Sequence, residues 1–98
     1  MSQAPLLQHI ETEEESIIET FHEIAQVLRL PELDWDFVHY DGETLVEGHP
    51  RAETDIGACP RWARFLGMSA VGANSESRSD CWLGVNGPWT LEIIAQVR

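Results

Sequence analysis

The side chains of this sequence that could do chemistry are two cysteines, four histidines and seventeen carboxylates. Cys59 directly precedes Pro60, where the residues that follow indicate a short helix whose dipole could lower the pKa of the thiol. A thiolate hydrolase also needs a histidine base and an oxyanion hole, and no motif locates either one. We therefore interpret Cys59 as a buried or capping residue and Cys81 as part of the core, and we predict no catalytic residues and no enzyme.

The histidines lack the spacing of a metal site. His9, His22, His39 and His49 all lie in the first half of the chain, among carboxylates. The spacings CxxC, HxxxH and HExxH, which place zinc ligands close together, do not occur. Close pairs of Asp and Glu arise by chance in so acidic a chain, so they do not argue for a glycosidase. We expect no metal and no cofactor.

The charge is distributed unevenly along the chain. The net charge is −11, and all six basic residues are arginines. Residues 1–55 hold fourteen Asp or Glu against two arginines, a net charge of −12, whereas residues 56–98 hold three against four, a net charge of +1. Such a field attracts positively charged partners and repels nucleic acid and anionic lipid. We therefore expect a basic protein partner, with no direct contact to nucleic acid or to a membrane.

The first fifteen residues, MSQAPLLQHIETEEE, lack the basic flank and the long apolar run of a signal peptide. No stretch reaches the roughly 18 apolar residues of a membrane span. We expect a cytoplasmic protein whose cysteines stay reduced, because disulfides are rare in that compartment. The sequence leaves open whether Cys59 pairs with Cys81 and whether the chain forms a homodimer.

The stretch ETEEESIIETF, residues 11–21, contains the expected start of a helix. Thr12 and Glu15 fit a capping box, and Glu13 and Glu14 would lie at the positive end of the helix dipole. Apolar residues then recur at intervals of three and four, which predicts an amphipathic helix over residues 13–29 that ends before Pro31. These residues are Ile17, Ile18, Phe21, Ile24, Ala25 and Leu28.

Capping does not explain Glu19 and Glu23, which follow Glu15 at i+4 and i+8 on the side opposite the apolar residues. Like charges at this spacing cost a few tenths of a kcal/mol per pair. The carboxylates lie about 6 Å apart along the helix axis, a distance comparable with the separation of neighbouring phosphates along one strand of a duplex. An ordinary solvated face explains the same charges equally well. If a hairpin packs beside the helix, its acids would extend the surface. The predicted partner-binding residues are Glu15, Glu19, Glu23, Asp34, Trp35, Asp36, Tyr40, Asp41, Glu43 and Glu47, with Trp35 or Tyr40 as anchor.

The stretch WDFVHYDGETLV predicts a hairpin, because Asp41-Gly42 suits the two turn positions of a type I′ turn. This turn would pair Tyr40 with Glu43, Val38 with Leu45 and Phe37 with Val46, and it leaves open which face is buried. HPRAETDIGA is typical of a loop, and CPRWARFLG indicates a short helix with Trp62, Phe65 and Leu66 on its inner side. AVGANSESRSD is typical of a second, mobile loop.

The clearest strand is at the end of the chain, where apolar residues alternate strictly at Trp89, Leu91, Ile93, Ala95 and Val97. A two-residue Asn-Gly turn would set Leu83 and Val85 on the other face. A three-residue loop, Asn86-Gly87-Pro88, instead aligns Cys81, Leu83 and Val85 with Ile93, Leu91 and Trp89. We predict the three-residue loop, because a slip of one residue exposes the whole apolar side of a strand.

These elements predict a single α+β domain over residues 1–98, with residues 1–11 flexible. The order is α-β-β-α-β-β, and the expected architecture is a four-stranded antiparallel sheet with one long and one short helix, at least the long one packed on one face. The acids of the strands could therefore lie on the face that the helix covers or on the opposite face.

Three functions fit the sequence. The first is an acidic, non-enzymatic inhibitor that occupies the basic site of a nucleic-acid-handling complex, as anti-restriction, anti-CRISPR and nuclease-immunity proteins do; this is an analogy of size and charge. The alternative is an accessory or structural subunit that docks through apolar residues and tryptophans, Trp35 and Trp82 among them. An enzyme that uses Cys59 is the weakest of the three.

Overall fold

The computed structural model describes residues 14–71, 80–87 and 89–97. They form an α+β domain with a five-stranded mixed sheet, in the strand order β1-β2-β5-β4-β3. The elements are α1 (Glu14–Leu28), β1 (Leu33–Tyr40), β2 (Glu43–Pro50), the 3-10 helix η1 (Glu53–Ala58), α2 (Cys59–Phe65), β3 (Ser69–Ala70), β4 (Cys81–Asn86) and β5 (Trp89–Ile94). The flexible segment expected at residues 1–11, the capping residue Thr12 and most of the second loop lie outside the described residues.

Helix α1 has the predicted position and the predicted apolar side. Ile17 and Phe21 are buried, as are Ile24 and Ala25. The helix ends where Arg29 adopts a left-handed conformation, with φ of 56°, and the amide of Leu30 donates to the carbonyl of Ala25 at 2.9 Å. This 6→1 hydrogen bond is that of a Schellman motif, and Pro31 then prevents the helix from continuing.

The first hairpin has the predicted register. Tyr40 pairs with Glu43, Val38 with Leu45 and Phe37 with Val46. Asp41 and Gly42 have φ values of 51° and 75°, as a type I′ turn requires. Val46 is fully buried and Val38 is exposed, so the face that carries Phe37 and Val46 is the one that packs inside.

The expected four-stranded antiparallel sheet is wrong in two respects. β2 and β5 are parallel neighbours, so the two hairpins join through a parallel pair at the centre of the sheet. A fifth strand, β3, adds Ser69 and Ala70 to the edge beside β4. The segment Glu53–Ala58, expected to be a loop, forms the 3-10 helix that leads into α2. A two-residue strand has too few side chains to show a pattern, and the parallel pairing joins segments that are distant in sequence.

The second hairpin has a different register from the predicted one. Asn86 pairs with Trp89 and Gly84 with Leu91, so the loop is two residues long and Leu83 and Val85 point away from the core. The three-residue loop was predicted because it puts the apolar residues of both strands on one face. That prediction is wrong because the position opposite Leu91 is Gly84, which has no side chain to bury. Met68 fills the space instead, since a Cβ on Gly84 would lie 2.9 Å from Cγ of Met68.

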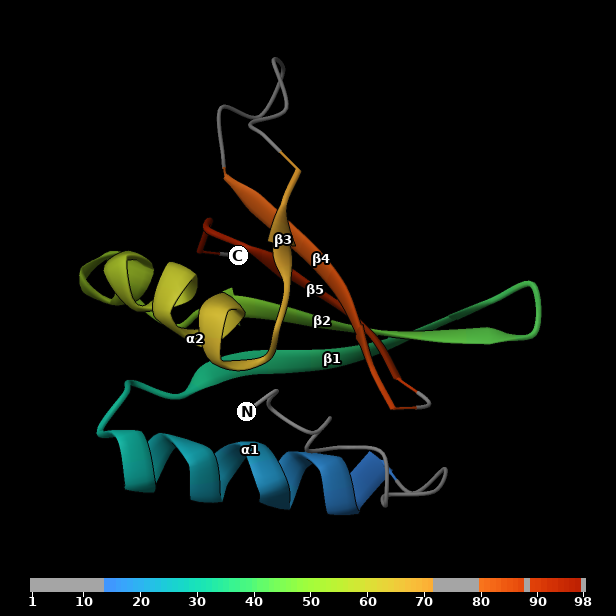
Figure 1. The fold of residues 1–98 in the computed structure, drawn as a ribbon, viewed down its shortest axis with the longest axis horizontal. Helices are drawn as coiled ribbons and strands as arrows, with labels where there is room; N and C mark the ends of the chain where they lie inside the picture. The colour runs from blue at the N-terminus through green and yellow to red at the C-terminus, as the bar shows by residue number, and fades with distance from the viewer. Residues whose placement is uncertain (1–13, 72–79, 88, 98) are drawn as a thin grey trace.

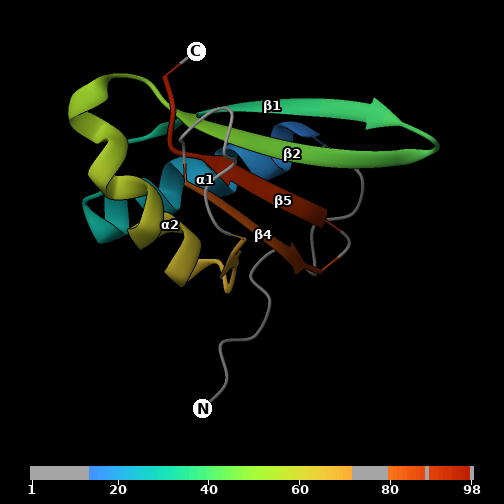
Figure 2. The ribbon, with the colours of Figure 1, turned by 90° about the horizontal axis from the view of Figure 1, so that it is seen from above.

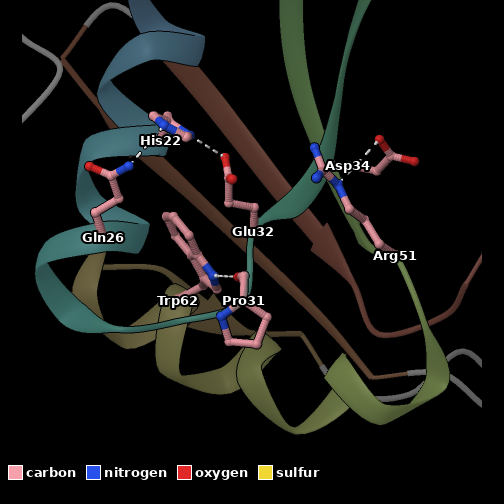
Figure 3. Close-up of polar contacts among 7 residues, drawn as sticks. All are labelled: His22, Gln26, Pro31, Glu32, Asp34, Arg51 and Trp62. Carbon is pink, nitrogen blue, oxygen red and sulfur yellow. Dashed lines mark hydrogen bonds and ion pairs between the residues drawn. The ribbon is translucent and has the colours of Figure 1, made fainter.

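Both helices pack on the same face of the sheet, which we call the helix face. Phe21 of α1 stacks on Trp35 of β1 with ring centroids 3.9 Å apart, and Trp62 of α2 meets both rings edge-on at 6.0 and 5.7 Å. The indole of Trp62 donates to the carbonyl of Pro31 at 2.8 Å (Figure 3). Trp35 and Trp82, which the accessory-subunit alternative uses for docking, are both partly buried against the core. Trp35 is therefore part of the core packing rather than a free anchor.

The opposite side of the sheet, which we call the open face, has neither helix packed on it. Figure 1 shows α1 running along one side of the strands, and Figure 2 shows it behind β1, β2 and β5. Val38, Leu83 and Val85 point from the open face, with exposed fractions of 36%, 39% and 71%. Within the described residues, the helices therefore cover only one face of this sheet.

Candidate functional site

The predicted partner-binding residues lie on two opposite sides of the molecule. Glu15, Glu19 and Glu23 are exposed on α1, opposite the side that packs on the sheet. Asp34 and Asp36 alternate with Trp35 along β1, so they point from the open face. One continuous negative surface across helix and hairpin was therefore a wrong expectation. The reason is that α1 packs over a face of the hairpin rather than beside its edge.

We call Glu15, Glu19 and Glu23 the acidic stripe. Within the described residues, none of the three forms an ion pair, whereas their neighbour Glu14 lies 3.1 Å from Nε2 of His39. The four-residue spacing places the three carboxylates along α1 at intervals of about 6 Å. Within the described structure, no cation is therefore paired with the acidic stripe.

A hollow adjoins the acidic stripe between the first turns of α1 and the middle of β1. It has a volume of about 390 Å³. We call it the acidic recess, and it is lined by Glu14, Glu15, Ile18, Glu19 and Phe37. Three carboxylates surround two apolar side chains, and Ile18 is 37% exposed. Such a recess can receive a long cationic side chain, whose stem packs on the apolar residues while its head group pairs with the acids.

On the open face, three carboxylates lie in a row across neighbouring strands. Asp36 of β1 pairs with Glu47 of β2, which pairs with Glu92 of β5. Neighbouring strands are about 4.8 Å apart, so the carboxylates of this row are crowded. We call Asp36, Glu47 and Glu92 the carboxylate row. All three are partly buried, unlike the acidic stripe.

Burial and crowding make one member of the carboxylate row harder to ionise. The pKa of Glu92 is raised by burial, by the negative charge of Glu47 and by a hydrogen bond with Glu47, while His49 opposes these effects. His49 is 8% exposed, and its Nδ1 donates to the carbonyl of Gln96 at 3.1 Å. Its Nε2 lies 2.7 Å from Oε1 of Glu47, which is hydrogen-bond distance. Glu47 therefore contacts both Glu92 and His49.

The remaining predicted residues are at the ends of the hairpin. Asp34 lies 3.9 Å from Nε of Arg51, a loose ion pair between two exposed side chains (Figure 3). Asp41 and Glu43 are exposed at the turn, and the side chain of Tyr40 lies outside the described part of the structure. Asp34 lies on the open face, and Asp41 and Glu43 lie at the turn of the hairpin. None of the three therefore adjoins the acidic stripe.

The cysteines have no arrangement for nucleophilic catalysis. Cys59 is fully buried, and burial together with the charge of Asp55 raises the pKa of its thiol to about 11. The expected lowering by the helix dipole is outweighed, because α2 has only seven residues and the thiol has no contact with water. The pKa of Cys81 is raised as well, first by partial burial and then by Glu92 and Asp80. The two cysteines are not joined in a disulfide.

The described residues contain no group of three or more His, Cys, Asp or Glu side chains arranged to hold a metal ion. None of their helices is long and apolar enough to cross a membrane.

Sequence reasoning missed Ile18, Phe37 and Glu92 as functional candidates. Ile18 belongs to the predicted apolar side of the helix, and Phe37 lies on one of the two hairpin faces between which the sequence does not decide. The position of Ile18 at the margin of the apolar side of α1 was the available signal, since a marginal residue is only partly covered. Glu92 was visible only as a polar residue alternating within a strand. No family model, curated protein or solved structure matches this chain.

Proposed function

We propose that this protein is a non-enzymatic binding protein whose acidic stripe and acidic recess engage the basic surface of a nucleic-acid-handling protein. The observation that carries the proposal is the set of three exposed carboxylates of the acidic stripe, which have no ion-pair partner among the described residues. Repulsion between them costs the helix stability. A helix selected only for stability would alternate these acids with cations.

The acidic recess supports the same proposal. An arginine or lysine of the partner would lay its stem on Ile18 and Phe37 and place its charged group between Glu15 and Glu19. The Phe37 ring adds a cation–π contact if the head group lies over its face. An apolar floor beneath a ring of acids favours a protein side chain over a free cation.

Such binding would be inhibitory if the partner uses the same groove for nucleic acid. Carboxylates about 6 Å apart along a straight helix form a line of negative charge, as the phosphates of one strand do at about 3.4 Å per nucleotide along the duplex axis. Cationic side chains arranged to meet phosphates could therefore meet the acidic stripe instead. The partner would then hold either this protein or its nucleic acid.

The test compares two variants that remove the same number of charges. Glu15→Gln/Glu19→Gln/Glu23→Gln removes the acidic stripe, and the matched control Asp41→Asn/Glu43→Gln/Glu53→Gln removes three exposed acids elsewhere. The partner is captured from a cell extract at low salt, identified, purified and then used in binding measurements. We expect the first variant to bind about tenfold more weakly or worse, mainly through slower association, and the control to change little.

Two outcomes would contradict the proposal. Equal losses in both variants would mean that net charge acts without a defined surface. Simultaneous binding of the nucleic acid and this protein by the partner, measured by a mobility shift, would rule out the inhibitory role.

The open face supports one alternative, an accessory subunit that docks through apolar residues. Val85 and Leu83 are exposed there beside the carboxylate row. In that case affinity should be nearly independent of salt, and Val85→Ser should weaken binding more than loss of the acidic stripe. Trp35→Ala is not informative for this purpose, because Trp35 belongs to the aromatic stack.

A further inference from the structure

A second groove lies towards the C-terminal end of α1, and its lining includes two arginines, Arg61 and Arg64, and one acid, Glu23 of the acidic stripe. Two adjoining hollows, of about 470 and 270 Å³, share Leu28 and Phe65 in their lining. The groove runs between the C-terminal half of α1 and α2, and we call it the arginine groove. Its apolar lining includes Ile24, Val27, Leu28, Leu30, Pro60 and Phe65.

Arginines stand along the α2 side of this groove. Arg61 and Arg64 are exposed, lie one helical turn apart and contribute to its lining. Arg29 lies between the lining residues Leu28 and Leu30 in the chain. None of the three forms an ion pair with a described residue, whereas Arg51, the other described arginine, lies near Asp34. In a chain with seventeen acids, the unpaired cations of the described part are thus gathered at one apolar groove.

We propose that the arginine groove binds an acidic amphipathic helix of a second protein. The lining on α1 extends from Thr20 to Leu28, about 12 Å, which is the length of a little over two helical turns. Apolar side chains at i, i+3 or i+4, and i+7 of the bound helix would enter the groove. Its carboxylates would pair with Arg61 and Arg64, where a guanidinium can bind a carboxylate through two parallel hydrogen bonds.

The rim offers a contact that can be changed without disturbing the fold. Val27 is 80% exposed although it lines the groove, and it faces Phe65 across the shared lining. An exposed valine beside an apolar groove is a surface that a partner would cover. Val85 is similarly exposed, at 71%, but it lies on the open face of the sheet. The chain thus supplies its own matched control.

The test uses a random library of 16-residue peptides displayed on phage and selected on the immobilised full chain. We expect the selected peptides to combine Asp or Glu with Leu, Ile or Phe at helical spacing. A selected peptide is then synthesised with a fluorescent label, and its affinity is measured for single variants whose folding has been checked by circular dichroism. Arg64→Glu and Val27→Glu should weaken binding about tenfold or more, in line with the loss of one desolvated contact.

The control variants are Arg51→Glu and Val85→Glu, which make the same chemical changes outside the groove and should bind within about twofold of the unaltered chain. A selection that yields only basic peptides, or peptides whose affinity ignores Arg64→Glu, would overturn the assignment. Sedimentation equilibrium provides the remaining test. A dimer that Arg64→Glu dissociates would show that a second copy of this chain fills the groove, and would also overturn it.

Discussion

The acidic stripe and the carboxylate row each contain three acids, yet they carry charge in different ways. On α1 the acids are spaced by a helical turn, exposed and unpaired with any described cation. On the open face they are spaced by one strand and partly buried, and Glu47 is linked to both Glu92 and His49. The difference teaches that burying and crowding carboxylates opposes their ionisation, whereas spacing them along an exposed helix does not bring them into contact.

The two groups also depend on different parts of the fold. The acidic stripe is positioned by the aromatic stack that packs α1 on the sheet. The carboxylate row is positioned by the pairing of three strands. Substitutions in the aromatic stack and in the carboxylate row test whether the two groups of acids depend on different interactions.

The largest effect is expected for Phe21→Ala. Phe21 is 2% exposed and stacks on Trp35, so its removal leaves a cavity beneath α1. The free energy of unfolding should fall by about 3–5 kcal/mol, measured by urea denaturation. Val27→Ala, on the exposed side of α1, should change it by less than about 0.5 kcal/mol. Similar losses in the two variants would mean that α1 is not held by this stack.

A smaller loss is expected for Gly48→Ala, which tests the same packing from the strand. A Cβ on Gly48 would lie 2.6 Å from Cζ3 of Trp35, whose ring is already stacked on Phe21 and cannot move away freely. The expected cost is about 1–3 kcal/mol of unfolding free energy. Gly57→Ala is the control, because a Cβ there would meet no atom within 4 Å. Equal denaturation midpoints for the two variants would contradict the close packing of Trp35.

The smallest effect is expected for Glu92→Gln in the carboxylate row. The pKa of Glu92 is raised above its ordinary value of 4.5, so the folded state keeps the proton to a higher pH than the unfolded state does. The stability contributed by the protonated form is therefore lost as the pH rises above 4.5. Glutamine cannot ionise, so the variant should have the higher melting temperature at pH 7–8, and the difference should vanish near pH 4.

Glu53→Gln, at an exposed position in η1, controls for the change in net charge. If Glu92→Gln and Glu53→Gln raise the melting temperature equally at neutral pH, the carboxylate row is no more crowded than the rest of the surface. The comparison with the acidic stripe would then lose its basis.

The local elements could be predicted from the sequence because their signals are local. The apolar spacing of α1 and the Asp41-Gly42 turn each depend on residues within a few positions of one another, and both predictions are confirmed. The second hairpin failed for a tertiary reason. Gly84 needs no burial and Met68 comes from another segment, so strict alternation in β5 alone could not fix the register.

The candidate site was predictable only in part. Exposure of Glu15, Glu19 and Glu23 followed from the helical pattern, and the structure confirms it. Their separation from Asp34 and Asp36 depends on which face of the hairpin α1 covers, and the strand pattern left that open. The arginine groove could not be foreseen, because it forms between two helices that are about thirty residues apart in sequence.

The end of α1 shows how this chain trades one property against another. Arg29 occupies a left-handed position that glycine fills at less cost, because an L side chain there is strained by about 1 kcal/mol. Replacement by glycine would relieve that strain and remove one of only six cations. Glycine at position 29 would make the end of the helix more stable, whereas arginine keeps a positive charge there. One position cannot provide both.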